Sequence, residues 1–155
     1  MEQYVIINEA DFLKARKKIR EAQKDKIGII FSSNDDELNK KVLEKEKINT
    51  LLLSLSGRKD WMKQRNSGFN QVFAKLAKKN NVSIGINLDE IIDAEKKEKA
   101  EILARIRQNI KLCNKNKLKM KFISKEKKDK YNLRSLGLSL GMPTWMTKEL
   151  YSKNN

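Results

Sequence analysis

Residues 50–88 read TLLLSLSGRKDWMKQRNSGFNQVFAKLAKKNNVSIGINL, and this stretch decides the fold of the chain. The unbroken apolar run at residues 50–55 is typical of a strand buried on both faces, and Gly57 begins the turn that follows it. From Phe69 onward apolar residues recur at helical spacing, and the Ser67 hydroxyl is the expected N-cap. Residues 82–88 form a second apolar run. The stretch therefore predicts a strand, a helix and a second strand, with a basic loop after the first strand.

The same alternation of strand and helix runs through the whole chain. Strands are expected at Tyr4–Ile7, Ile27–Phe31, Thr50–Leu55, Val82–Leu88 and Leu118–Ile123. Helices are expected at Asp11–Gln23, Asp35–Glu46, from Phe69 to Ala77, at Asp93–Cys113 and at Asn132–Leu140, with a last one capped by Thr144. Alternation with short linkers implies parallel strands joined by right-handed crossovers. The sequence therefore predicts the α/β class.

The chain is too short for this alternation of strands and helices to form a complete barrel. A complete (β/α)₈ barrel takes about 250 residues, whereas this chain has 155. We therefore expect a parallel-strand, partial TIM-like (β/α) barrel that is either incomplete or closed by a partner. Residues 118–122 alternate apolar residues with lysine, which suits an edge strand protected by charge. Residues 1–152 are expected to form a single domain, and residues 153–155 a frayed tail.

The charge balance points to a polyanionic partner. Lysine and arginine number 35 against 20 acidic residues, a formal net charge of +15. No apolar run approaches the ~18 residues of a membrane span, and no basic, apolar and small-residue leader opens the chain, so a membrane partner is not expected. The lone Cys113 cannot form an internal disulfide, which fits a reducing cytoplasm.

The chain contains no histidine. Together with a single cysteine, this leaves only oxygen sites for a metal ion, because transition-metal centres rely on imidazole and thiolate ligands. A hydrolytic centre carried by the protein is therefore not expected. We predict no catalytic residues and no metal ligands.

Six segments, taken in order, form a pattern of motifs. They are Arg58-Lys59-Asp60, residues 66–77, residues 82–88, residues 108–113 with Lys115, residues 118–124 and residues 132–142. This ordered set resembles archaeal ribonuclease P protein component 3, the counterpart of a eukaryotic subunit shared by ribonucleases P and MRP. Residues 61–65 have the position of an insertion, and Gln71 stands where a histidine is common. The family carries strand-helix units before the position of Tyr4, so the resemblance implies an amino-terminally shortened barrel.

The resemblance implies a non-catalytic RNA-binding subunit of ribonuclease P, the ribonucleoprotein endonuclease that removes 5′ leaders from precursor tRNA. In that family the RNA carries the chemistry with Mg²⁺, so no cofactor is expected on the protein itself. The implied partners are ribonuclease P RNA, precursor tRNA, the small α/β subunit of the Pop-five type and other ribonuclease P proteins.

Basic residues in loops and at family motifs are the candidates for RNA contact, since guanidinium and ammonium groups bind backbone phosphates. They are Arg58, Lys59, Lys63, Arg65, Lys75, Lys111, Lys115 and Arg134. Each can equally be a solvated surface charge. Trp61 can stack on an unpaired base or pack against protein. Ser67-Gly68 can cap a helix or cradle a phosphate.

Two other functions stay open at this point. The first is a general nucleic-acid-binding or ribosome-associated α/β protein, which would bind unrelated nucleic acids equally well. The second is a magnesium-dependent phosphodiesterase. It would require convergence of the carboxylates Asp60, Asp89, Glu90 and Asp93 at the strand ends.

Overall fold

The computed structural model describes residues 3–150 and contains one five-stranded parallel sheet in those residues. The strands are β1 (Tyr4–Asn8), β2 (Gly28–Ser32), β3 (Thr50–Leu53), β4 (Ser83–Asn87) and β5 (Met120–Ile123). They pair in chain order, β1-β2-β3-β4-β5, with every pair parallel. The five strand positions expected from the sequence are confirmed.

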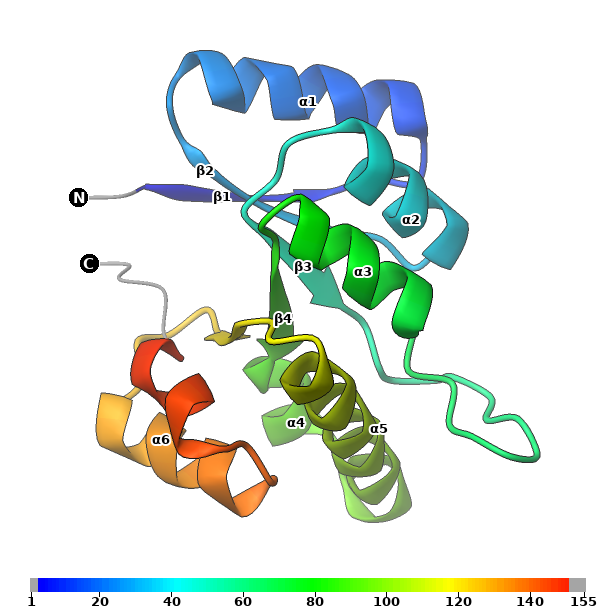
Figure 1. Ribbon diagram of the computed structural model, residues 1–155, viewed down its shortest axis with the longest axis vertical. Helices are drawn as coiled ribbons and strands as arrows, with labels where there is room; N and C mark the ends of the chain where they lie inside the picture. The colour runs from blue at the N-terminus through cyan, green and yellow to red at the C-terminus, as the bar shows by residue number, and fades with distance from the viewer. Residues whose placement is uncertain (1–2, 151–155) are drawn as a thin grey trace.

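Helices separate the strands. They are α1 (Phe12–Lys24), α2 (Asp36–Lys45), α3 (Gln71–Lys79), α4 (Leu88–Asp93), α5 (Lys96–Lys115), α6 (Lys130–Ser139) and the 3₁₀ helix η1 (Thr144–Glu149). Neighbouring helices pack on one another in chain order, α1 on α2, α2 on α3 and α3 on α5 (Figure 1). Sequential strand order with right-handed crossovers keeps these helices on one face of the sheet, as in a (β/α) barrel.

Alternate strand residues form two separate apolar layers. Ile29, Phe31 and Leu51 belong to the main core between sheet and helices. Ile30, Leu52 and Ile123 point to the other face and form a second, small cluster with Tyr4 packed against it. Because successive side chains of a strand point to opposite faces, the central strands β2 and β3 are buried on both faces.

The sheet curls as part of a barrel does. The Lys121 Nζ atom, on edge strand β5, lies 5.8 Å from the ring centre of Tyr4 on edge strand β1. A Cβ at Gly28 would lie 2.5 Å from that ring, so Tyr4 lies directly over the sheet. The edge strands β1 and β5 do not pair with each other in residues 3–150. The predicted α/β class, with parallel strands alternating with helices in one sheet, is confirmed.

Three local expectations differ from the structure. Asn70, not Ser67, caps α3, and its side chain accepts bonds from the Val72 and Phe73 amides. The long helix expected at Asp93–Cys113 begins only at Lys96, after Ala94, whose backbone is extended. Pro143, not Thr144, precedes η1. In each case a loop conformation set by tertiary contacts moves a helix start by one to three residues. The expected tail 153–155 lies outside the described residues.

The β5 edge is covered as well as charged. The Phe122 amide donates to the Leu150 carbonyl at 2.7 Å, so the end of the described chain takes up one free strand amide. Met146 and Leu150 are buried beneath that segment. Among residues 3–150, no helix combines the length and apolar character needed to cross a bilayer.

Candidate RNA-binding interface

The loop after β3, residues 54–70, is the basic loop of this protein, and a buried arginine of α5 holds it in place. The Arg105 guanidinium, 2% exposed, donates to the Leu55 carbonyl at 2.9 Å and the Arg58 carbonyl at 2.7 Å. Its Nε atom lies 3.1 Å from the Asp60 carboxylate. A buried guanidinium needs such partners for its fixed fork of donors. One side chain therefore fastens three points of the loop.

Asp60 is the second anchor of the loop. It also accepts from the Asn66 amide at 2.9 Å and pairs with Arg65 at 2.8 Å. Desolvation raises the pKa of Asp60, but the Asn66 amide and the charges of Arg105 and Arg65 outweigh it and hold the pKa below its usual value. The carboxylate stays ionised at neutral pH and ties both sides of the loop to α5.

Arg58 is turned toward the protein rather than toward solvent. Its side chain is 11% exposed and binds the Asp36 carboxylate in a bidentate pair at 2.8 and 2.9 Å. Its Nε atom donates to the Ser54 carbonyl. Gly68 has φ +67°, and a Cβ there would lie 2.5 Å from the Arg58 guanidinium. The structure therefore gives Arg58 a positioning role between the basic loop and α2.

The other predicted RNA-binding residues fall into two regions. All seven are exposed: Lys59, Lys63 and Arg65 on the basic loop, Lys75 on α3, Lys111 and Lys115 on α5, and Arg134 on α6. The basic loop projects on one side of the molecule, whereas α6 lies on the far side (Figure 1). Lys59, Lys63, Lys111 and Lys115 have no ion pair within the described part of the chain. The fold thus gathers six predicted cations near the basic loop, α3 and α5 and separates Arg134 from them.

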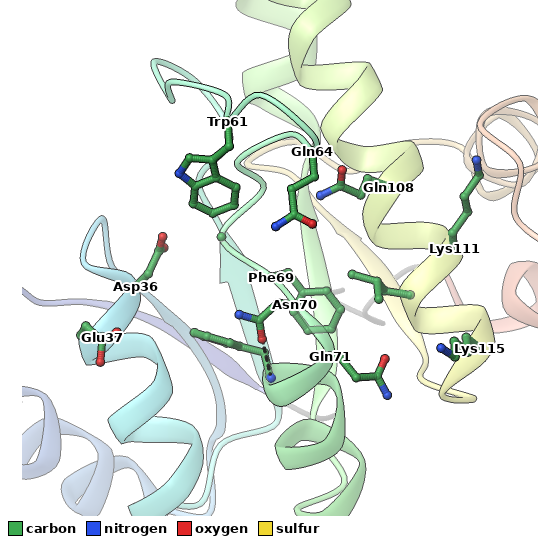
Figure 2. Close-up of a pocket in the computed structure, with 13 residues that line it drawn as sticks. Asp36, Glu37, Trp61, Gln64, Phe69, Asn70, Gln71, Gln108, Lys111 and Lys115 are labelled. Atoms are coloured by element: carbon green, nitrogen blue, oxygen red, sulfur yellow. Dashed lines mark hydrogen bonds between the residues drawn. The ribbon is translucent and has the colours of Figure 1, made fainter.

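A cleft of about 690 Å³ lies between the basic loop and the neighbouring helices. Its lining includes Trp61 and Gln64 from the loop, Phe69 and Phe73 at the α3 end, and Gln108, Lys111 and Lys115 from α5. Asp36 and Glu37 at the start of α2 form the opposite side (Figure 2). Trp61 is 58% exposed. Aromatic, cationic and amide residues thus line one opening.

Ser67 does not form the phosphate cradle that its sequence context allows. It is 1% exposed, and its hydroxyl donates to the Phe69 carbonyl and accepts from Gln108 Nε2 at 3.2 Å. Gln108 also bonds both backbone groups of Arg65. The serine therefore helps Gln108 fasten the end of the basic loop.

Three of the four carboxylates of the phosphodiesterase hypothesis serve separate structural contacts. Asp60 binds two arginines, Glu90 accepts from the Leu55 and Ser56 amides, and Asp89 accepts from Ser124 and Lys125. The described residues hold no group of three or more acidic, histidine or cysteine side chains that could bind a metal ion. The convergence which that hypothesis requires does not occur in residues 3–150.

Cys113 lies fully buried in the main core. Burial raises the pKa of its thiol far above the usual value, so the thiolate that reacts or binds metals does not form. The residue is a small core hydrophobe of α5.

Sequence reasoning missed Arg105 and Gln108 as the residues that organise the loop. A signal for Arg105 was present, because it lies three residues after Ile102 and next to Ile106 in the buried stripe of α5. A charged residue within an apolar stripe indicates a buried partner. Gln108 carries no such signal, since glutamine is common on exposed helix faces.

The fold and the basic loop together define a class of protein. Members of this class are parallel α/β proteins whose strands follow (β/α) order and whose basic loop, after the third strand, is held in place by buried side chains. A chain in the cryo-EM structure of archaeal ribonuclease P with mature tRNA has the same fold. The TM-score is 0.76 at 22% identity, over 94% of this chain and 62% of that chain. No protein-family model matches the sequence.

Sequence relatives point to one family within this class. Proteins named ribonuclease P protein component 3 from Methanococcus maripaludis strains C6 and C5 are 27% and 26% identical over 147 residues. These alignments cover 94% of this chain and 59% of the relatives, so the chain spans about three fifths of their length. The comparisons confirm the predicted resemblance to the ribonuclease P protein component 3 family.

Proposed function

We propose that this protein is an RNA-binding subunit of ribonuclease P that acts in tRNA 5′ maturation without catalysing bond cleavage itself. The observation that carries the proposal is the coincidence of that family resemblance with a cationic, braced loop on a chain of net charge +15. Four lysines of the loop and α5 have no internal ion pair among the described residues and are available to backbone phosphates. Phosphate neutralisation is the main source of affinity for nucleic acid.

The task of the protein in this proposal is to stabilise the RNA. Cations held on a rigid frame reduce repulsion between RNA phosphates, which Mg²⁺ otherwise screens. In this proposal the Mg²⁺ of the reaction lies on the RNA, as the resemblance to the family implies. We place the protein in the cytoplasm, where a single buried cysteine needs no oxidising partner.

The further partners follow from the same proposal. Precursor tRNA and other ribonuclease P proteins are expected in the complex, and the small α/β subunit of the Pop-five type is the expected direct partner. The β1 edge of the curled sheet supports a protein partner, since no second strand pairs with it in residues 3–150 and unpaired strand edges are sites of strand addition.

Reconstitution tests the proposal. Cognate ribonuclease P RNA is assayed for cleavage of precursor tRNA over a range of Mg²⁺ concentrations, with and without this protein and the Pop-five-type subunit. The protein is expected to lower the Mg²⁺ requirement and to show no cleavage without the RNA. An unchanged Mg²⁺ requirement contradicts the proposal. Equal affinity for duplex DNA, unrelated RNA and ribonuclease P RNA favours a general nucleic-acid-binding protein instead.

A further inference from the structure

The cleft beside the basic loop contains polar groups that the fold does not use. Four of the residues that line it, Glu37, Gln64, Lys111 and Lys115, have no side-chain hydrogen bond or ion pair inside the described chain. By contrast, the Gln71 amide is paired with Asn116 and Gln108 with the loop backbone. Unused groups of mixed chemistry around one opening indicate a ligand site.

We propose that this cleft binds one unstacked nucleotide of a single-stranded RNA segment. Its base lies against the Trp61 ring, and its phosphate lies beside Lys111 and Lys115. The inference names the RNA element recognised at the interface and rests on the proposed function.

Trp61 is presented as a stacking surface. It follows Asp60, which Arg105 and Arg65 hold, and its amide donates to the Gln64 carbonyl at 3.1 Å, which closes a turn. The ring nevertheless stays 58% exposed and points from the loop toward the cleft (Figure 2). A large aromatic side chain held in place but left uncovered is suited to stack on a base, because every base has a π-face.

The floor of the cleft is apolar and rigid. Phe69 is 5% and Phe73 7% exposed, and their rings pack edge to face with centres 6.5 Å apart. The partly buried Leu112 lies beside them. A volume of about 690 Å³ falls in the range of small-ligand sites. A base stacked within a duplex cannot enter such a cleft, whereas an unstacked one can.

The two sides of the cleft carry opposite charge. Asp36 and Glu37 lie on the α2 side, and Lys111 and Lys115 lie on α5 (Figure 2). Carboxylates repel a phosphate and accept hydrogen bonds from base amino groups, whereas the lysines attract the phosphate. The backbone of the RNA is therefore expected to follow α5, with the base edge toward Glu37 and the Gln64 amide.

A fluorescent base tests the site. A short single-stranded RNA with 2-aminopurine at its centre is titrated with the wild-type protein, the variants Trp61→Ala and Trp61→Phe, and the control Tyr131→Ala. Tyr131 is a matched control because it is 65% exposed on α6, away from the cleft. Stacking quenches 2-aminopurine, so wild type is expected to quench it on binding. Trp61→Ala should lose the quenching and bind about 5- to 150-fold more weakly, whereas Trp61→Phe and Tyr131→Ala retain both.

The duplex form of the same RNA separates stacking from general attraction. Trp61→Ala is expected to bind the duplex as wild type does. Equal quenching and affinity in Trp61→Ala, or an equal loss for single strand and duplex, would overturn the proposal. The proposal would also be overturned if Trp61→Ala bound RNA as wild type does but associated more weakly with the Pop-five-type subunit. Trp61 would then be a protein contact. This assay uses no ribonuclease P RNA. The quenching result therefore stands even if the reconstitution fails, and the reconstitution result stands even if the quenching is absent.

Discussion

At the scale of the residue, the position of the functional loop depends on a few buried polar side chains. Arg105 joins α5 to residues 55, 58 and 60, and Arg58 joins the same loop to Asp36 of α2. These guanidinium groups are largely removed from solvent, and their N–H groups donate to carbonyls and carboxylates. They set where the exposed lysines and Trp61 stand.

Replacing Arg105 tests this role. Arg105→Ala removes the partner of two carbonyls and of Asp60, and it should lower the free energy of unfolding by about 3 kcal/mol. Arg107→Ala, on the exposed side of the same helix, should stay within about 0.5 kcal/mol of wild type. Urea unfolding followed by circular dichroism measures both. Equal stability of the two variants would show that Arg105 does not brace the loop.

At the scale of the element, the helix after the basic loop begins where a side chain can satisfy its amides. The Asn70 side chain accepts from the Val72 and Phe73 amides at 3.0 and 3.1 Å. Ser67 has the right chemistry for a cap but lies buried, three residues earlier, with its hydroxyl bonded to Phe69 and Gln108. The start of α3 therefore follows from loop packing as well as from cap chemistry.

The Asn70 cap gives a prediction for α3. Asn70→Ala leaves two helix amides without their acceptor and should cost about 1 kcal/mol of stability. Asn70→Asp keeps an acceptor at the same place and should retain most of it. Thermal and urea unfolding of the three proteins provide the comparison. If Asn70→Ala unfolds as wild type does, the cap assignment is wrong.

At the scale of the whole molecule, the parallel sheet in chain order keeps the helices on one face and leaves the opposite face with a small apolar cluster. Tyr4 and Lys121 approach each other across that face although they lie on opposite edge strands. The four lysines that have no ion pair within residues 3–150 and are proposed to bind RNA, Lys59, Lys63, Lys111 and Lys115, lie by contrast on the basic loop and α5. Protein contacts are thus expected at the open β1 edge and RNA contacts at the loop side.

The salt dependence of RNA binding tests the distribution of charge. With Lys59, Lys63, Lys111 and Lys115 each neutralising one phosphate, log affinity for single-stranded RNA should fall against log salt with a slope of about −3. The double substitution Lys111→Gln and Lys115→Gln should reduce that slope by about 1.4. The matched pair Lys14→Gln and Lys17→Gln, on exposed α1 positions, should leave the slope unchanged. Filter binding at several salt concentrations gives the slopes, and an equal effect of both pairs contradicts a localised interface.

Much of the fold could be predicted from the sequence because strands and helices depend on local apolar spacing. The apolar run at residues 50–55 and the alternation at residues 118–122 both mark strands that the structure contains. The short helix α4, Leu88–Asp93, was not predicted, because six residues are too few to show helical periodicity. The candidate site was predicted as a basic loop, but the separation of Arg134 from it could not be predicted from spacing.

The sequence by itself determined a parallel α/β chain without histidine, with excess positive charge and with Trp61 among the basic residues of a loop. Only the tertiary structure decided that Arg58 faces inward, that Arg105 holds Asp60, and that Trp61 stands over a cleft. The physical reason is distance along the chain. Apolar periodicity acts over a few residues, whereas the Arg105 and Asp60 side chains are 45 residues apart and meet only when α5 packs beside the end of β3.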